Sequence, residues 1–143
     1  MTAKACASPP LPAGCEIIPL DIKGDQRGRL IAIEGLRDVP FAIERVYYIY
    51  ATQPEVDRGF HAHRSLRQVA VAVSGGCTMV LDDGTVRTEV RLDRPDLALL
   101  IGPMVWREMR HFSDDCVLMV LADAHYDEAD YIHDYRRFIE AVA

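Results

Sequence analysis

Two histidines, His61 and His63, stand two positions apart in the segment RGFHAHR (58–64). Residues two apart on a β-strand project from the same face, so we expect these imidazoles to lie side by side. Imidazole exchanges protons near neutral pH, with an unperturbed pKa of about 6.5, and it is also a common metal ligand. The pair therefore indicates either acid–base chemistry or metal binding.

A metal site would need a third and usually a fourth ligand at a defined position. The segment GFHAH resembles the start of the cupin metal signature, in which Gly and His-x-His precede a Glu and, on a later strand, another His. Here Arg67 or Gln68 takes the place of the Glu, and the later segment IGPMVWREM (101–109) contains no histidine. We therefore expect the cupin fold without its metal.

Packing is the plain alternative for these histidines, which could be hydrogen-bonded core or surface residues. The following segment weakens this interpretation, because Gln68, Ala70 and Ala72 share one face of the next expected strand. Small alanines at positions that could carry Val or Leu suggest space kept for a ligand. We favour a pocket over packing, and both interpretations remain open at this point.

Metal-free acid–base chemistry is the third possibility. A histidine can remove a proton next to a ketone if Tyr, Arg or backbone donors stabilise the enolate oxygen. The segment around residue 47 supplies such groups, because Arg45, Tyr47 and Ile49 share one strand face and Tyr48 and Tyr50 share the other. At least one tyrosine hydroxyl should therefore point inward.

Short runs of β character must position these residues, and turn-forming residues separate them. A tight turn at Asp83 and Gly84 predicts a hairpin, because glycine accepts the positive φ that such a turn requires. From Asp127 onward, apolar residues recur at helical spacing, which predicts one C-terminal helix. The expected strands fall within 15–20, 29–34, 42–52, 59–64, 68–74, 77–83, 85–92, 98–102, 105–109 and 116–122. About ten such strands indicate an antiparallel sandwich or barrel.

The length and charge of the chain limit its function. Its 143 residues fit one domain, which we place at 15–143, after an Ala- and Pro-rich segment, 1–14, expected to be a flexible tail. The net charge of −6 and only two lysines argue against nucleic-acid binding, which depends on clustered basic residues. No apolar run approaches the ~20 residues that a membrane span requires, so we expect no membrane association.

The four cysteines show no metal-ligand spacing and do not suggest a disulfide scaffold. They are Cys6, Cys15, Cys77 and Cys116. A reducing cytoplasm is the simpler interpretation of such cysteine usage.

Several blocks of the chain, taken together, resemble the WxcM-like sugar 3,4-ketoisomerases that act on dTDP-4-keto-6-deoxyglucose. The resemblance covers about residues 16–142 and rests on RGRLIAIE, PFAIERVYYIY, RGFHAHR, the VLDDG hairpin, IGPMVWREM, FSDDCVLMVLA and YDEADYI. It implies an all-β, cupin-type double-stranded β-helix (jelly roll) with one C-terminal α-helix. It also implies a metal-independent homodimer with exchanged N-terminal strands, which needs no cofactor and makes a dTDP-3-keto-6-deoxyhexose for deoxy-aminosugar synthesis.

The resemblance also implies roles for individual residues. His61 would be the base at carbon 3, with His63 beside it, and Tyr47 would bind or donate a proton at the other carbon. Arg27 and Arg107 match positions near the sugar that differ between members yielding different configurations at carbon 4. Further substrate contacts, including those to the diphosphate and thymine, are expected from Arg58, Arg64, Gln68 and Trp106.

Three alternatives remain beside this reading. The first is a dTDP-sugar 3,5-epimerase-like cupin, which usually pairs its histidine base with an aspartate. The second is a noncatalytic cupin that binds a nucleotide sugar, and the third is a metal-dependent cupin oxygenase.

Overall fold

The computed structural model describes residues 10–143, which fold mainly as antiparallel β-strands. In chain order the strands are β1 (Glu16–Pro19), β2 (Lys23–Asp25), β3 (Gly28–Leu30), β4 (Arg45–Ile49), β5 (Arg58–His63), β6 (Gln68–Ser74), β7 (Cys77–Asp82), β8 (Arg87–Leu92), β9 (Leu97–Ile101), β10 (Trp106–Arg110), β11 (Val117–Ala122) and β12 (Tyr131–Ile132). A 3₁₀ turn, η1 (Glu128–Asp130), precedes β12, and the helix α1 (Tyr135–Val142) follows it.

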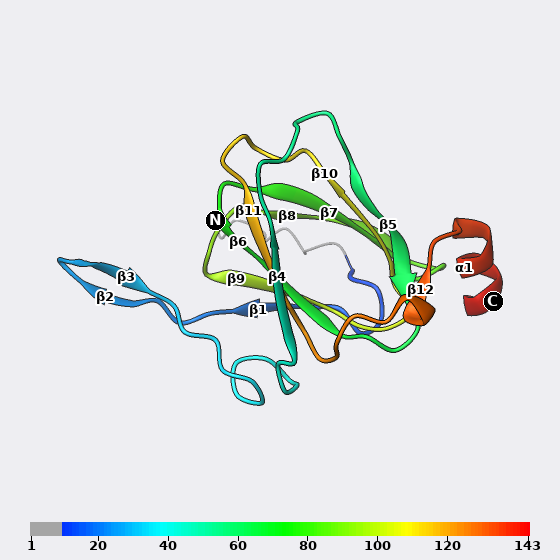
Figure 1. Ribbon diagram of the computed structural model, residues 1–143, viewed down its shortest axis with the longest axis horizontal. Coiled ribbons are helices and arrows are strands. Elements are labelled where there is room, and N and C mark those ends of the chain that lie inside the picture. The colour runs from blue at the N-terminus through cyan, green and yellow to red at the C-terminus, as the bar shows by residue number, and fades with distance from the viewer. Residues whose placement is uncertain (1–9) are drawn as a thin grey trace, which may run out of the picture.

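Two five-stranded sheets form the body of the fold (Figure 1). The first has the strand order β1-β9-β6-β11-β4 and the second β12-β5-β10-β7-β8. Consecutive strands β5, β6 and β7 alternate between the sheets, as do β9, β10 and β11, which is the arrangement of a jelly roll. The expected all-β class with a C-terminal α-helix is confirmed.

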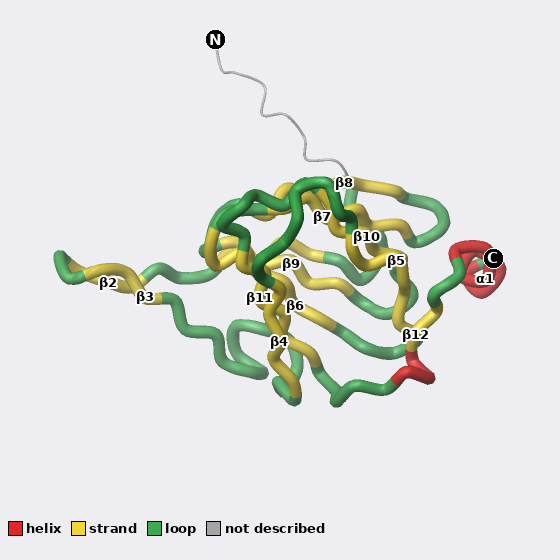
Figure 2. Tube along the Cα trace, turned by 45° about the horizontal axis from the view of Figure 1, so that its top comes forward, coloured by secondary structure: helices red, strands yellow, loops and turns green. Residues whose placement is uncertain are grey.

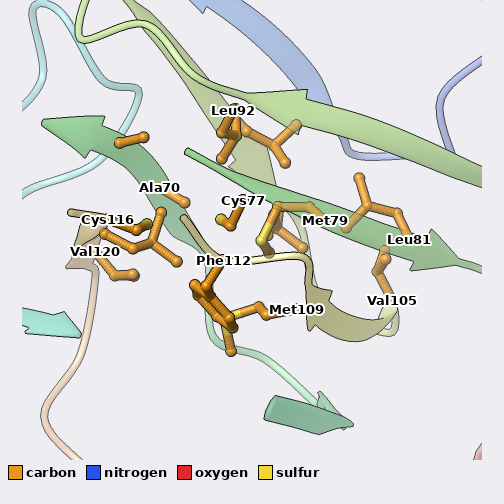
Figure 3. Close-up of a cluster of buried hydrophobic side chains, with 14 residues drawn as sticks. Ala70, Cys77, Met79, Leu81, Leu92, Val105, Met109, Phe112, Cys116 and Val120 are labelled. Carbon is orange, nitrogen blue, oxygen red and sulfur yellow. The ribbon is translucent and has the colours of Figure 1, made fainter. Parts of the chain in front are cut away.

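The main hydrophobic core lies between the two sheets (Figure 3). Strand β6 contributes Ala70 and Ala72, while β7 contributes Met79 and Leu81 from the opposite sheet. The residues between β10 and β11 add Phe112, which is 3% exposed. Both alanines are buried in this core, and only a pocket of about 10 Å³ remains beside Ala70.

The outer face of each sheet is also covered. Val69, Val71 and Leu121 pack beneath Val39 and Phe41 from the loop that precedes β4. On the second sheet, Trp106 of β10 packs against the buried Phe138 of α1. Apolar residues on the outer faces therefore attach the loop and the helix to the sheets.

The β2–β3 hairpin projects away from both sheets (Figures 1 and 2). It leaves Ile22 and Leu30 exposed, although both are large apolar residues. The strand expected at 29–34 is therefore wrong beyond Leu30, since the chain leaves the hairpin there and continues as a loop.

Other boundaries also differ from the sequence predictions; for example, β5 begins at Arg58, β9 begins at Leu97 and β10 extends to Arg110. The predicted helix begins at Tyr135 rather than near Asp127, because η1 and β12 intervene and β12 pairs with β5. The hairpin of β7 and β8 is confirmed with Gly84 at a φ of +93°, but its strands end at Asp82 and resume at Arg87.

The segment 10–14, expected in the flexible tail, contacts the sheets. The Pro10 carbonyl accepts a hydrogen bond from Thr88, and the Ala13 N–H donates to Asp83. Residues 1–9 of the expected tail lie outside the described residues. No helix within 10–143 has the length and apolar character that crossing a membrane requires.

Candidate active site

A β-bulge in β5 sets the position of the two histidines. Arg107 of β10 pairs with His61, but its neighbour Glu108 pairs with Gly59, so Phe60 is the extra residue. Gly59 and Phe60 adopt φ values of +90° and +58°. A Cβ on Gly59 would lie 3.0 Å from the Arg107 carbonyl oxygen, so both the backbone conformation and this close approach favour glycine.

The rings of His61 and His63 lie side by side, as their spacing predicts. Their centroids are 4.9 Å apart and the rings meet edge to face. Tyr131 of β12 contacts both, with centroid distances of 5.0 Å to His61 and 4.3 Å to His63. The pairing of β12 with β5 therefore adds a tyrosine to the histidine pair.

His61 opens onto a cavity of about 550 Å³, here called the His61 cavity. It is large enough for a small-molecule ligand. A separate pocket between His61, Gln68 and Ala70 measures only about 10 Å³, roughly the space of one water molecule, so the room for a ligand expected above the alanines is not found there. The cavity is lined by Arg45, Tyr47, Ile49, Asp57, Arg58, Gly59, Phe60, His61, Met109, Tyr126 and Tyr131.

A chain of buried hydrogen bonds forms the inner wall of this site. Arg107 Nη1 donates to Gln68 Oε1 over 2.6 Å, and Gln68 Nε2 donates to Tyr47 Oη over 2.9 Å. Arg107 Nη2 donates to the Val105 carbonyl oxygen over 3.1 Å. Because Tyr47 Oη accepts the bond from Gln68, the hydroxyl hydrogen of Tyr47 is free to be donated into the cavity.

The inner wall carries the positive charge of Arg107, whose hydrogen-bond partners Gln68 and the Val105 carbonyl are uncharged. Burial lowers the pKa of Arg107 to about 10, which leaves the guanidinium charged at neutral pH. Its Nε is buried without a hydrogen-bond partner. A buried cation in this position can stabilise negative charge that develops on a ligand in the adjacent cavity.

Burial and this cation set the protonation of the neighbouring groups. Burial first, and then the charge of Arg107, lower the pKa of His61 to about 4. Burial raises the pKa of Tyr47, and Arg107 offsets only part of that effect. At neutral pH the site therefore holds an imidazole that can accept a proton beside a phenol that can donate one.

His63 is more deeply buried than His61, with an exposed fraction of 1%. Its Nδ1 lies 3.2 Å from Asp130 Oδ2, and its Nε2 is buried without a hydrogen-bond partner. Burial, Arg107 and His61 lower its pKa. Burial raises the pKa of Asp130, but hydrogen bonds from Ser65 and Leu66 outweigh burial and hold that pKa below its usual value. The pair is thus a neutral imidazole and a carboxylate.

A second cavity, of about 280 Å³, borders His63 and is here called the His63 cavity. It shares only Arg45 and Tyr131 with the His61 cavity. The other lining residues are His63, Ser65, Leu66, Asp123, Ala124, His125, Asp127 and Asp130.

The structure brings some of the predicted substrate-binding residues to the site and leaves others outside it. Arg58 lines the His61 cavity, and Gln68 and Arg107 lie behind its wall. Arg64 is exposed and lines neither cavity. Arg27 lies in the turn of the projecting β2–β3 hairpin, paired with Asp25.

Trp106 does not lie at the site, although its predicted role was to contact the ligand. It is 3% exposed, packs against Phe138 and Tyr135, and donates its indole N–H to Glu108. Trp106 alternates with Arg107 along β10, so when Arg107 faces the interior of the jelly roll, Trp106 faces the helix.

Several residues of the site were absent from the predicted set. Tyr131 and Asp130 contact the histidines, and Arg45 and Tyr126 line the His61 cavity. The block YDEADYI contains three of them and carried part of the family resemblance, but helical periodicity assigned it to the terminal helix. Within residues 10–143, no three His, Cys, Asp or Glu side chains are grouped so that they could hold a metal ion.

Comparisons with known proteins agree with this architecture. The family model described as "FdtA: WxcM-like, C-terminal" matches residues 13–143. The TDP-4-oxo-6-deoxy-alpha-D-glucose-3,4-oxoisomerase of Aneurinibacillus thermoaerophilus is 52% identical over 119 residues, which are 83% of this chain and 86% of that protein.

Two crystal structures share the fold and much of the sequence. A 3,4-ketoisomerase from Helicobacter canadensis has a TM-score of 0.87 and 47% identity, covering 90% of this chain and 96% of that one. The 3,4-ketoisomerase QdtA from Thermoanaerobacterium thermosaccharolyticum, solved as a His-to-Asn mutant in complex with TDP-4-keto-6-deoxyglucose, has a TM-score of 0.90 and 38% identity, covering 92% and 96%.

Proposed function

The chain belongs to the family described as "FdtA: WxcM-like, C-terminal", and we propose that it is a sugar 3,4-ketoisomerase that moves the keto group of dTDP-4-keto-6-deoxyglucose from carbon 4 to carbon 3. The product would be a dTDP-3-keto-6-deoxyhexose for deoxy-aminosugar synthesis. The observation that carries this proposal is a neutral His61 facing a cavity beside a protonated Tyr47 and a buried Arg107. These groups match the proton transfers that such a reaction needs.

His61 acts as the base at carbon 3. The hydrogen there is acidic because it lies next to the ketone at carbon 4, and its removal gives an enediolate. A base must be unprotonated to accept it, and the lowered pKa of His61 keeps the imidazole neutral near pH 7. Returning a proton to carbon 4 then completes the movement of hydrogen between the two carbons.

Tyr47 and Arg107 act on the oxygen atoms. The reaction also moves a hydrogen from the oxygen at carbon 3 to the oxygen at carbon 4, and the free Tyr47 hydroxyl can donate to one of them. The charge of the buried Arg107 lowers the free energy of the enediolate. Hydrogen moves as a proton throughout, so we propose that the reaction needs neither a redox cofactor nor a metal ion.

The nucleotide part of the substrate is assigned to the rim of the His61 cavity. Arg58 and Arg45 line the cavity, and an arginine can bind a phosphate through two parallel hydrogen bonds. The exposed ring of Phe60, projected by the bulge, offers a flat surface for the base. Arg64 remains a further candidate for the diphosphate.

We propose that the chain forms a homodimer with exchanged N-terminal strands. The β2–β3 hairpin extends beyond the sheets and has little to pack against in its own chain (Figure 1). Tyr48 on the edge strand β4 is also exposed. In such a dimer, Arg27 of a second copy would approach the sugar.

We also propose one domain, 15–143, in the cytoplasm, where its free thiols Cys15, Cys77 and Cys116 would remain reduced.

Proton NMR in deuterated water tests the proposed reaction against the epimerase alternative. Purified protein is mixed with dTDP-4-keto-6-deoxyglucose, and the hexose hydrogens are followed. A 3-keto sugar with deuterium at carbon 4 supports the ketoisomerase. Exchange at carbons 3 and 5 without carbonyl migration supports a 3,5-epimerase, and no change supports a binding protein.

The contacts of His61 bear on the epimerase alternative. Within residues 10–143, Asp130 bonds His63 and no carboxylate bonds His61. A histidine base of the epimerase type is expected to have an aspartate partner, so this pattern favours the ketoisomerase.

A further inference from the structure

Gln68 connects two residues of the site without lining the His61 cavity itself. It begins β6, is 2% exposed, and pairs with Ala122 of β11 on one side and Ile101 of β9 on the other. Its side chain accepts a hydrogen bond from Arg107 and donates one to Tyr47. The Gln68 amide thus links a cation on the second sheet to a phenol on the first.

Arg107 determines the direction of both hydrogen bonds. A charged guanidinium can only donate, so the Gln68 atom that faces Arg107 must be the acceptor Oε1. The amide nitrogen Nε2 must then face Tyr47, and because this nitrogen only donates, Tyr47 Oη has to accept. The hydroxyl hydrogen of Tyr47 therefore cannot lie along this bond and must point elsewhere.

Arg107 is itself held in place. Its Nη2 donates to the Val105 carbonyl oxygen over 3.1 Å, and the residue is 2% exposed. Its backbone pairs on both sides, with His61 of β5 and Leu81 of β7. Because the first donor of the chain is fixed, the orientations of the Gln68 amide and the Tyr47 hydroxyl are fixed as well.

Tyr47 borders space that a ligand can occupy. It lines the His61 cavity, and it also lines the pocket of about 10 Å³ together with His61, Gln68 and Arg107. Within residues 10–143, no protein group accepts the hydroxyl hydrogen of Tyr47. This hydrogen is therefore available to an oxygen atom of a sugar bound in the His61 cavity.

We propose that Gln68 is a positioning residue that makes Tyr47 a hydrogen-bond donor toward the substrate, and that Gln68 does not touch the sugar. The proposal rests on the proposed ketoisomerase function. A tyrosine hydroxyl without such a partner can donate or accept, and its hydrogen can rotate. Gln68 removes the orientation in which this hydrogen points into the wall, so Tyr47 is ready to donate when a sugar oxygen gains negative charge. No bond of Gln68 forms or breaks in the reaction.

Two substitutions of Gln68 test this role. Gln68→Met keeps a side chain of similar size but removes both hydrogen bonds, so the Tyr47 hydroxyl can rotate, and kcat should fall about 3- to 10-fold with KM nearly unchanged. Gln68→Glu keeps the shape, but both carboxylate oxygens accept, so Tyr47 would donate into the wall instead of the cavity. Its kcat should fall about 10-fold or more. Circular dichroism and Tm show whether each variant is folded.

The decisive measurement combines Gln68→Met with a second substitution. Tyr47→Phe lacks the hydroxyl through which Gln68 is proposed to act, so adding Gln68→Met to it should lower kcat by less than about 2-fold further. Tyr48→Phe is the matched control, because Tyr48 is exposed on the opposite face of the same strand. In that background Gln68→Met should have its full effect on kcat.

The outcomes separate the role of Gln68 from the underlying function. If the wild-type protein moves the carbonyl and the effect of Gln68→Met disappears only in the Tyr47→Phe background, the positioning role is supported. If Gln68→Met leaves kcat unchanged, or lowers it equally in both backgrounds, the role is wrong while the function stands. A raised KM with unchanged kcat would make Gln68 a substrate-binding residue and would also overturn the proposal. If the wild-type protein does not move the carbonyl, the proposed function itself fails, and the role of Gln68 fails with it.

Discussion

Lowering the pH tests the environment of His61 directly. An ordinary histidine with a pKa of about 6.5 would be about 3% neutral at pH 5, whereas a pKa of about 4 leaves about 90% neutral. If neutral His61 is the base, kcat/KM should fall by only about 10% between pH 7 and pH 5. An unperturbed histidine would instead lose about 25-fold over the same range.

The assay is the pH dependence of kcat/KM from pH 4 to pH 8, together with NMR titration of the histidine rings. Protein labelled with ¹³C in histidine gives a signal for each ring, and His61→Asn identifies the one that belongs to His61. Circular dichroism at each pH separates loss of activity from loss of fold. In Arg107→Gln the midpoint of the His61 signal should rise, because the second-largest cause of the lowered pKa is removed.

A midpoint for His61 near pH 6.5 in the folded wild-type protein would refute this reasoning. It would show that burial and the Arg107 charge do not act on the ring as the structure indicates. An acidic limb of kcat/KM near pH 6.5, with the NMR midpoint near 4, would instead remove His61 from the role of base.

Four further results are expected. His61→Asn should reduce turnover by about 100 to 10,000-fold with little change in Tm or TDP binding by calorimetry, because it removes the base and little packing. Tyr47→Phe should lower kcat by at least about 10-fold, whereas Tyr48→Phe, on the opposite face of the same strand, should not, and equal effects in steady-state assays would contradict the inward role of Tyr47. Urea unfolding should show a loss of about 2 kcal/mol from His61 between pH 7 and pH 4.5, because the unfolded chain protonates this ring below about pH 6.5 and the folded chain only near 4, and His61→Asn should remove that part of the loss. Dialysis against EDTA should leave turnover unchanged, and activity restored only by an added divalent metal would overturn the metal-free assignment.

The pattern of side chains predicted much of the fold and the centre of the site. Alternation along the strands placed His61 beside His63, and Tyr47 on the inward face of β4 with Tyr48 outward. The small residues on β6 did not mark ligand space, because the pocket beside Ala70 measures only about 10 Å³. The predictions from alternation succeeded because a period of two residues depends only on the strand itself.

Features that depend on neighbouring strands could not be predicted in this way. The bulge at Phe60 requires a positive φ at a large residue, which no side-chain pattern reveals, although Gly59 beside it is consistent with it. Asp130 and Tyr131 reach the histidines only because β12 pairs with β5. Their local sequence matched helical spacing, so the structure was needed to place them. Likewise, the distance of Arg27 from the sheets follows from the direction of a hairpin, which is not encoded in its own residues.

The most direct test of the central claim follows the carbonyl carbon itself. dTDP-4-keto-6-deoxyglucose labelled with ¹³C at carbons 3 and 4 is incubated with the purified protein and observed by ¹³C NMR, with His61→Asn as the control. The account predicts that the ketone signal passes from carbon 4 to carbon 3 with the wild-type protein, and at a rate reduced by orders of magnitude with His61→Asn. A ketone that stays at carbon 4 with the folded wild-type protein would contradict it, and equal rates in the two proteins would exclude His61 as the base.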